Sequence, residues 1–394
     1  MLNGRLTVWG KEAYAQSRKG EQMAKISEAP LFPILNQPLV GIARMAAEAQ
    51  HADGGHLIEF RMLKVRSILN KSVSKRQLSL AYSINPYRGC EFGCKYCYAR
   101  YTHEFMAPQI MVPQTVASEG ETSDGAALPV INFRDPVSFE RMIFLKENAA
   151  WLLEQELKKI DPALEIALGT ATDPYQPIER RVQITRSLLE VFARKAGYRL
   201  GIVTKSRLIE RDIDLLQEIS RRNTLVVHVT ITTPDAKLAR ILEPRAPRPD
   251  LRFQAVKRLR EAGIVAGVFG SPLLPGITDR QEALDSLARR ASAVGASFFA
   301  AHPLFLKPCS RPTYLSFVRE HFPSLEADYA KRFANADFAS RTYSSKLSEM
   351  VGLACRKYGL RQRWGDDALL TTSQHGKRTP PQRASVPNQE RLFA

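Results

Sequence analysis

The sequence predicts an α/β protein that is built on a parallel β-sheet. Between residues 78 and 302, six short segments rich in apolar and β-branched residues alternate with amphipathic segments of helical length. Strands that are joined through helices lie parallel, with right-handed crossovers. The chain has 394 residues, 44% of them hydrophobic, which suits one large catalytic domain with additional segments. A closed or partly closed barrel and a doubly wound open sheet both satisfy this pattern.

The periodicity of the apolar residues predicts each element in turn. Strands are expected at residues 78–84, 165–169, 200–204, 225–232, 264–270 and 297–302. Helices are expected at residues 139–159, 179–195, 210–222, 251–262 and 280–294. After Pro308 the pattern is helical over 314–332 and 343–358, which predicts a C-terminal helical segment packed on the core.

Composition divides the chain into four parts. Residues 1–75 have no sustained periodicity and are read as an N-terminal extension, residues 76–310 as the core domain and residues 311–374 as the C-terminal helical segment. Residues 375–394 combine prolines with basic residues, which predicts a disordered tail. Residues 117–129 are expected to form a surface loop. The sequence shows neither an apolar signal nor a membrane-spanning segment, so we expect a cytoplasmic protein.

The charge balance favours a polyanionic partner. Lys and Arg outnumber Asp and Glu by 57 to 40, a net charge of +17. Residues 1–75 carry +5 and residues 376–394 carry +3, so +9 remains with the middle of the chain. Nucleic acid is the commonest polyanion in a cell, and a solvated basic surface is the alternative. Basic residues near the predicted strand ends are Arg88, Lys95, Arg100, Lys205, Arg207, Arg245 and Arg248, which we expect near the barrel mouth if nucleic acid is the substrate.

Three of the five cysteines lie within eight residues, directly after the first predicted strand. Cys90, Cys94 and Cys97 have the spacing C-x3-C-x2-C, in which mutual disulfides would be strained. Structural zinc usually takes four protein ligands, so a zinc site would need a further residue such as His103. A [4Fe–4S] cluster held by three cysteines leaves one iron open to a substrate. The sequence therefore predicts a metal centre at this loop.

With the aromatic Tyr96 before the last cysteine, this motif resembles the signature of the radical S-adenosylmethionine (SAM) superfamily. Residues 83–100, 167–179, 203–206, 230–235, 242–246 and 272–276 resemble the branch named after spore photoproduct lyase, and the resemblance covers about residues 80–305. It implies a partial (β/α)6 barrel of the TIM type, a [4Fe–4S] cluster and SAM. It also implies an external electron donor of the flavodoxin or ferredoxin type. The implied activity is cleavage of SAM to a radical that removes a hydrogen atom from a substrate, with nucleic acid and DNA repair of the lyase type as candidates.

The resemblance also implies residues that contact SAM. Tyr96 would lie against the adenine, Thr170 and Asp173 would bind the ammonium group, and Pro275 would shape the adenine pocket. Polar residues at the ends of the third and fourth strands would meet the ribose or the carboxylate: Thr204, Lys205, Ser206, Thr230 and Thr232. A packed aromatic, a strand end or a helix cap is the structural alternative for each. Glu243 and Arg245 either pair with one another in a structural turn, which we favour, or reach the active site. His302 is either a hydrogen-bonded structural residue, which we favour, or a catalyst.

The sequence departs from that branch at one position of consequence. Spore photoproduct lyase carries a hydrogen-donor cysteine a short way after the cluster motif, whereas no cysteine lies between Cys97 and Cys309 here. Cys309 or Tyr175 could take the donor's place. Two other functions remain open on the sequence alone: a zinc-containing nucleic-acid-binding module without catalysis, and a radical SAM enzyme that acts on a protein or a small molecule.

Overall fold

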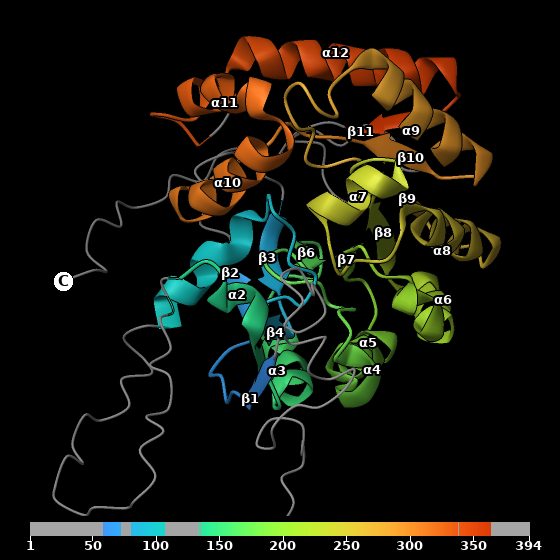
Figure 1. Ribbon diagram of the computed structural model, residues 1–394. Coiled ribbons are helices and arrows are strands. Elements are labelled where there is room, and N and C mark those ends of the chain that lie inside the picture. Colours follow the sequence, from blue (N-terminus) through green and yellow to red (C-terminus); the bar gives the residue numbers. More distant parts are fainter. Residues whose placement is uncertain (1–57, 72–79, 107–132, 134, 338, 364–394) are drawn as a thin grey trace, which may run out of the picture. The chain divides into compact units, whose positions relative to one another are not determined.

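The computed structural model describes residues 58–71, 80–106, 133, 135–337 and 339–363 (Figure 1). Its main sheet has eight strands in the order β11-β10-β9-β8-β7-β6-β3-β2. The six central strands are β3 (Leu80–Ile84), β6 (Glu165–Leu168), β7 (Arg199–Thr204), β8 (Thr224–Thr230), β9 (Ala266–Phe269) and β10 (Phe298–Ala300). All six run parallel, as the helical crossovers predict.

Strand order decides between the two topologies that the sequence left open. Each central strand pairs with the next one along the chain, without the reversal that defines a doubly wound sheet. One edge is extended by β2 (Leu69–Lys71), antiparallel to β3, and the other by β11 (Arg361–Arg363), parallel to β10. Within the described ranges these two edge strands do not pair with one another, so the sheet is a partial barrel.

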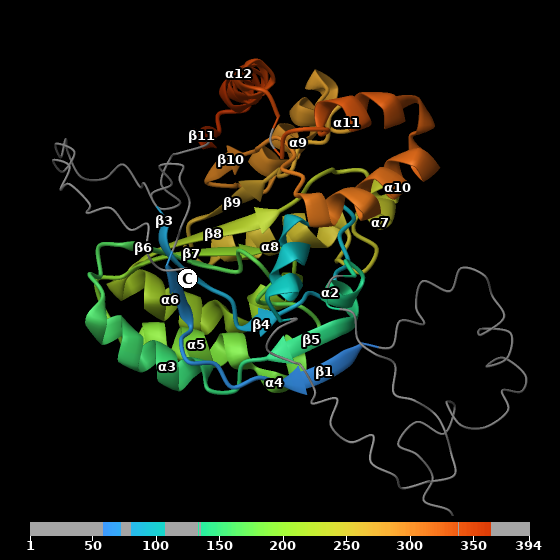
Figure 2. The same cartoon turned by 90° about the vertical axis from the view of Figure 1, so that its left-hand side faces the viewer.

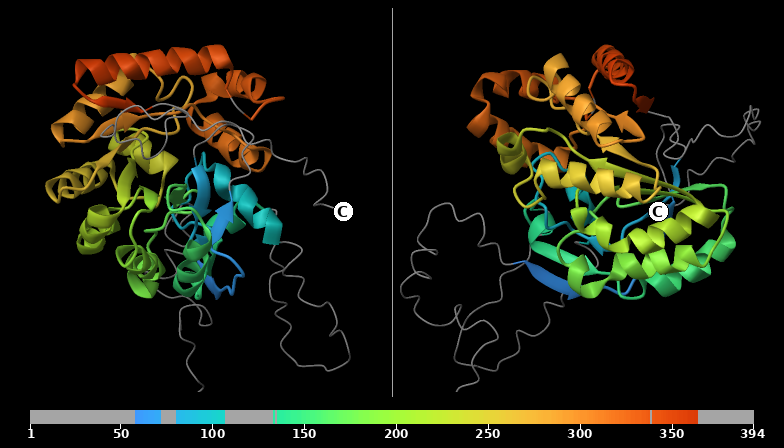
Figure 3. Two further views of the ribbon diagram at one scale, coloured as in Figure 1. Left: turned by 180° about the vertical axis from the view of Figure 1, so that it is seen from behind. Right: turned by 90° about the vertical axis from the view of Figure 1, so that its right-hand side faces the viewer.

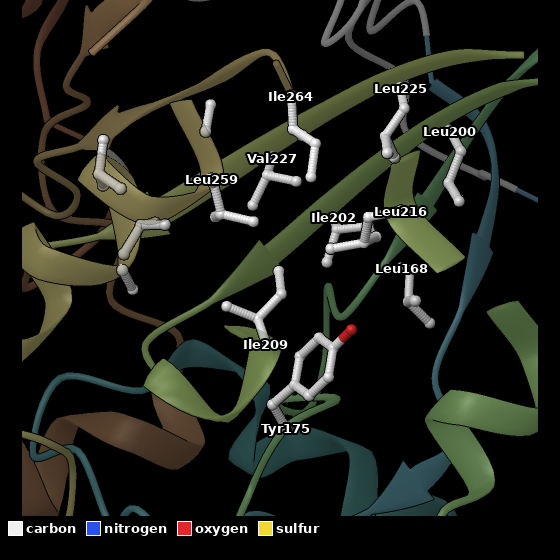
Figure 4. Close-up of a cluster of buried hydrophobic side chains, with 14 of the residues drawn as sticks. Leu168, Tyr175, Leu200, Ile202, Ile209, Leu216, Leu225, Val227, Leu259 and Ile264 are labelled. Carbon is white, nitrogen blue, oxygen red and sulfur yellow. The ribbon is translucent and has the colours of Figure 1, made fainter. Parts of the chain in front are cut away.

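Helices cover the outer face of this sheet (Figures 1 and 2). They are α3 (Ala149–Glu156), α5 (Ile184–Ala193), α6 (Ile213–Arg222), α8 (Pro249–Glu261) and α9 (Gln281–Ala293). Figure 4 shows part of the core between strands and helices, where Leu168, Ile202 and Val227 face Leu216 and Leu259. None of these five side chains has exposed surface. Their burial holds the helices against the outer face of the strands.

Two predicted helices are wrong in part. Over residues 139–159 the chain forms α2 (Ser138–Arg141), strand β5 (Met142–Leu145) and only then α3. Strand β5 pairs in parallel with β1 (Glu59–Met62) and antiparallel with β4 (Tyr87–Arg88), which makes a second, three-stranded sheet. The helix expected at 179–195 is interrupted at Gln183, whose φ of 52° ends α4 (Glu179–Val182) before α5 begins.

The described chain ends in strand β11, which the expected helical segment did not include, but the elements between Pro308 and that strand are mainly helices, as expected. They are α10 (Arg311–His321), α11 (Glu326–Arg332) and α12 (Arg341–Lys357), and Figure 3 shows α12 lying along the side of the sheet that carries α9. Leu347 and Val351 of α12 belong to the main core. The predicted loop at 117–129 and the tail at 375–394 lie outside the described residues. No helix among the described ranges is long and apolar enough to span a membrane.

Candidate active site

A cavity of about 360 Å³ lies at the carboxyl ends of the parallel strands. Each of the six central strands contributes lining residues, either from its last positions or from the loop that follows it. They come from within residues 90–99, 169–173, 203–205, 230, 269–272 and 302–305. Active sites of parallel barrels gather at this edge, so this cavity is the candidate active site.

The cysteine loop is fixed by backbone hydrogen bonds at both ends. The Cys90 N–H donates to Phe139 O at 2.9 Å, and the Lys95 N–H donates to Leu242 O at 2.9 Å. Between them, Gly93 has φ +61°, a left-handed conformation that other residues rarely adopt. The loop therefore curls so that Cys90, Cys94 and Cys97 all line the cavity.

The donor set fits an iron–sulfur cluster. All three cysteines are free thiols that face one largely apolar cavity. Burial raises the pKa of the Cys94 thiol to about 12 and that of Cys90 well above its ordinary value. Thiolates here consequently need a bound cation, and a [4Fe–4S] cluster supplies one iron to each of the three.

The zinc alternative finds no support in the geometry. His103, the suggested fourth ligand, is buried, its Nε2 lies 3.0 Å from Met142 O, and its ring packs edge-on against Phe139. In the part of the chain that the structure describes, no three His, Cys, Asp or Glu side chains are arranged to hold a single metal ion. His103 therefore belongs to the packing beneath the loop.

Asp173 joins the second and third strand ends. Its Oδ1 accepts from Thr204 Oγ1 at 2.7 Å, and its Oδ2 accepts from the Lys205 N–H at 2.7 Å. Burial raises the pKa of this carboxyl, and the two hydrogen bonds partly oppose that effect. Asp173, Thr204 and Lys205 all line the cavity, so the carboxylate has a structural contact and still faces the site.

Tyr96 is held by a buried ion pair. Its hydroxyl lies 2.9 Å from Thr232 Oγ1 and donates to Glu243 Oε1. Glu243 Oε2 in turn lies 2.5 Å from Arg252 NH2, and both side chains are 1% exposed. The ring of Tyr96 is therefore a fixed wall of the cavity. Glu243 pairs with Arg252 rather than with Arg245, so the expected Glu243–Arg245 pair is wrong.

The structure brings together most of the predicted SAM contacts, but not all of them. Tyr96, Thr170, Asp173, Thr204, Lys205 and Thr230 line the cavity. Three others serve neighbouring structure. Ser206 accepts from the Leu208 N–H at 3.2 Å, Thr232 binds the Tyr96 hydroxyl, and Pro275 O accepts from the Tyr329 hydroxyl at 2.7 Å.

Two lining residues, Tyr98 and Phe305, had no sequence signal, and neither had Lys307 beside them. The Tyr98 hydroxyl donates to Thr170 O, and its ring lies 5.8 Å from that of Phe305. Lys307 places its Nζ 4.0 Å from the ring centroid of Tyr101, beside this pair. Tyr98 could have been found from its place directly after Cys97, whereas Phe305 and Lys307 come from a loop without a motif.

Most basic residues expected at the mouth bind neighbouring groups instead. Of the seven, Lys205 lines the cavity. Arg100 and Arg245 both bind Glu140, while Arg207 lies 3.2 Å from Glu210 and Arg248 lies 3.0 Å from Asp250. These four arginines are engaged in ion pairs, two of them beneath the cysteine loop and two at more exposed positions, and none of the four lines the cavity.

The two proposed hydrogen donors lie in different surroundings. Tyr175 is completely buried in the core between sheet and helices, as Figure 4 shows, and does not line the cavity. Cys309 is half-buried next to Ser310, whose hydroxyl donates to Cys97 O at 2.7 Å. Tyr175 also adjoins the loop through its neighbour Gln176, whose Oε1 accepts from the Glu91 N–H at 2.8 Å, but the Tyr175 side chain is enclosed in the core. His302 lines the cavity, with its Nδ1 3.1 Å from Ser271 Oγ.

Fold and site together define a partial barrel whose strand ends surround a cavity lined by three free cysteines. The family model of the radical SAM superfamily matches residues 84–288. The chain belongs to this superfamily, and it is a radical SAM enzyme. Its cofactors are a [4Fe–4S] cluster and SAM, and an external electron donor must supply its electrons.

Relatives cover most of the chain. An uncharacterized protein of Mycobacterium tuberculosis (strain H37Rv) is 29% identical over 334 residues, which is 84% of this chain and 90% of the relative. An uncharacterized protein of Methanocaldococcus jannaschii is 29% identical over 198 residues, 50% of this chain and 62% of the relative.

Solved structures share the fold. Spore photoproduct lyase complexed with dinucleoside spore photoproduct is 16% identical, with a TM-score of 0.51 over 78% of this chain and 82% of the lyase. A lyase mutant with bound AdoMet and dinucleoside spore photoproduct is 15% identical, with the same TM-score and coverage. This likeness confirms the partial barrel that the resemblance implied.

Proposed function

We propose that Cys90, Cys94 and Cys97 hold the cluster and that the surrounding strand ends hold SAM. The observation that carries this proposal is that all three thiols line one cavity with the polar ends of β6, β7 and β8. When bound, the reduced cluster and SAM together supply a 5′-deoxyadenosyl radical, which removes a hydrogen atom from a substrate carbon. The chain's own task is to bind, orient and exclude water.

The SAM contacts follow from charge and position. Lys205 carries a cation suited to the methionine carboxylate, and Asp173 carries a carboxylate suited to the ammonium group. Thr204 keeps the Asp173 carboxylate oriented through their 2.7 Å hydrogen bond. Tyr96, fixed by Glu243 and Thr232, offers a flat surface to the adenine. Thr170 and Thr230 complete the polar wall.

We propose nucleic acid as the substrate. The net charge of +17 supports this choice, as does the rim formed by Tyr98, Phe305 and Lys307, where flat rings lie beside a cation. The lyase with the same fold is complexed with a dinucleoside photoproduct. A repair reaction of the lyase type would then use Cys309 as the donor.

The reductant and the location follow from the cofactor. A low-potential one-electron protein of the flavodoxin or ferredoxin type suits the cluster, and its oxygen sensitivity favours the cytoplasm.

Isotope transfer tests the substrate. Anaerobic, reduced enzyme is incubated with SAM and with deuterated DNA, RNA or a deuterated protein fraction, and deuterium is measured in 5′-deoxyadenosine. Label from nucleic acid alone is expected. Label from the protein fraction alone would contradict the proposal, and a Cys97→Ala enzyme gives the background.

An aromatic variant at the rim adds a second test. Tyr98→Leu is expected to reduce label transfer from nucleic acid by roughly 5- to 150-fold, since base stacking on one aromatic contributes about 1–3 kcal/mol. Trp151→Leu is the matched control, because Trp151 is an aromatic on α3 that is 64% exposed and does not line the cavity. Equal label transfer from nucleic acid in both variants would refute the proposal that a base stacks on Tyr98.

A further inference from the structure

One peptide unit of the cysteine loop connects a cluster ligand to a buried cation. The N–H of the Glu91–Phe92 peptide acts to lower the pKa of the Cys90 thiol, against the larger effect of burial. The carbonyl of the same peptide, Glu91 O, accepts from Arg245 Nε. A peptide that donates at one end and accepts from a cation at the other is polarised, and its N–H becomes a stronger donor.

Arg245 is fixed in place by an acidic residue beneath the loop. Its NH2 binds Glu140 Oε2, and its backbone N–H reaches Phe92 O at 3.4 Å. Glu140 Oε1 also accepts from Arg100 NH1 at 3.2 Å, and Arg100 NH2 donates to Cys94 O at 3.0 Å. The Arg100–Glu140–Arg245 triad therefore touches the carbonyls on the outer side of the loop.

The three side chains of the triad sum to one positive charge, and Arg245 also interacts with the nearby Glu91 carboxyl, whose pKa burial raises. Burial acts to raise the pKa of Glu140, but the two arginines hold it below its ordinary value, so the carboxylate is ionised. Glu140 is 7% and Arg100 2% exposed, while the Arg245 side chain is 19% exposed. Two guanidinium groups and one carboxylate leave a net charge of +1, which water screens only weakly at this depth.

We propose that Arg245, held by Glu140, is a positioning residue that raises the reduction potential of the cluster through the Glu91–Phe92 peptide. Reduction adds one electron from the external one-electron donor, and the charge of the cluster falls by one. No bond forms or breaks at the triad, and no proton moves there. A nearby cation and a stronger N–H···S hydrogen bond both stabilise the more negative, reduced state.

Redox titration of the reconstituted holoenzyme tests the proposal. The midpoint potential is measured anaerobically, without substrate, against dyes of known potential. Arg245→Gln removes the charge and is expected to shift the potential to more negative values. Glu140→Gln removes the opposing charge and is expected to shift it to more positive values. Arg245→Lys restores the charge and is expected to return most of the shift.

A matched control lies three residues further along the chain. Arg248→Gln removes the same charge from an ion pair with Asp250 whose side chains are 62% and 44% exposed, and it contacts no residue of the loop in the contacts described. Its potential is expected to equal that of the wild type. Shifts of the same sign in Arg245→Gln and Glu140→Gln would mean that the triad only holds the loop together, and would overturn the proposal. A shift in Arg245→Gln no larger than in Arg248→Gln would do the same.

The inference rests on Cys90 as a cluster ligand, which the proposed function assigns. Iron and sulfide content separates the two. A Cys90→Ala enzyme that keeps its full cluster would refute the ligand assignment itself. Loss of the cluster in that variant, with an unshifted potential in Arg245→Gln, would refute only the role of Arg245. If Arg245→Gln does not retain a cluster, the direction of the shift in Glu140→Gln decides.

Discussion

Gly93 is a position where a single added methyl group should damage the cysteine loop. A Cβ added there would lie 2.8 Å from Arg245 Cζ and would overlap with Glu140 Oε2 and Arg245 NH2. The backbone φ of +61° adds a second cost for any side chain. Gly93→Ala therefore combines backbone strain with a collision against a buried ion pair.

The size of the effect can be worked out by comparison with another glycine. A side chain in the left-handed region costs roughly 1–2 kcal/mol, and forcing a methyl into a filled site costs about 1–3 kcal/mol more. Gly263 has φ +80° but no atom within 4 Å of an added Cβ. Gly263→Ala should therefore lose only about 1–2 kcal/mol of unfolding free energy, whereas Gly93→Ala should lose about 2–5 kcal/mol.

Urea unfolding of the two variants, followed by circular dichroism, measures this difference. Iron content after anaerobic reconstitution gives a second readout, and it should fall in Gly93→Ala and stay normal in Gly263→Ala. Equal losses of stability in both variants, with a full cluster in Gly93→Ala, would refute the packing that we describe around the loop.

Three further predictions concern the cavity wall and the packing beneath it. Asp173→Asn should retain the cluster but bind SAM about 10- to 100-fold more weakly in equilibrium dialysis, since a hydrogen bond to a charged group contributes about 1.5–3 kcal/mol. Unchanged affinity for SAM would mean that Asp173 serves only its structural contacts with Thr204 and Lys205. Arg252→Met should lower the unfolding free energy by about 3–5 kcal/mol because it leaves the Glu243 carboxylate buried and unpaired. The double variant with Glu243→Gln should recover part of that loss, and simple additivity would argue against the pair. Burial lowers the pKa of His103 to about 4, whereas the unfolded chain keeps a value near 6.5. Between those two values the unfolded state binds more protons than the folded state. The free energy of unfolding should therefore be highest above about pH 6.5 and fall by about 2 kcal/mol between pH 7 and 5. Urea titrations at each pH should show a weaker pH dependence in His103→Gln.

The sequence was sufficient where function depends on neighbours along the chain. The three cysteines lie in eight residues, so their common loop follows from spacing alone. The alternation of strand and helix likewise predicted the six parallel strands. Strand order was decided by the structure, because periodicity describes each element and not its partner.

Contacts between distant segments account for what the sequence did not show. Met142–Leu145 is a run of four buried apolar residues that a helix or a strand could contain, and its partner Glu59–Met62 lies about eighty residues earlier. The sequence places Arg245 nearest to Glu243 along the chain, but α8 brings Arg252 into contact with the Glu243 carboxylate. A local motif carries no information on either choice.

Strand β11 determines where a truncated fragment of this protein should end. The family match ends at residue 288, inside α9, so a fragment with that boundary would lack β10 and β11 and would end in an incomplete helix. Strand β9 would then present its unpaired backbone groups and the ring of Phe269 to solvent, an edge that invites chain-to-chain association. The family match is therefore shorter than the smallest fragment expected to stay in solution, which runs at least to Arg363.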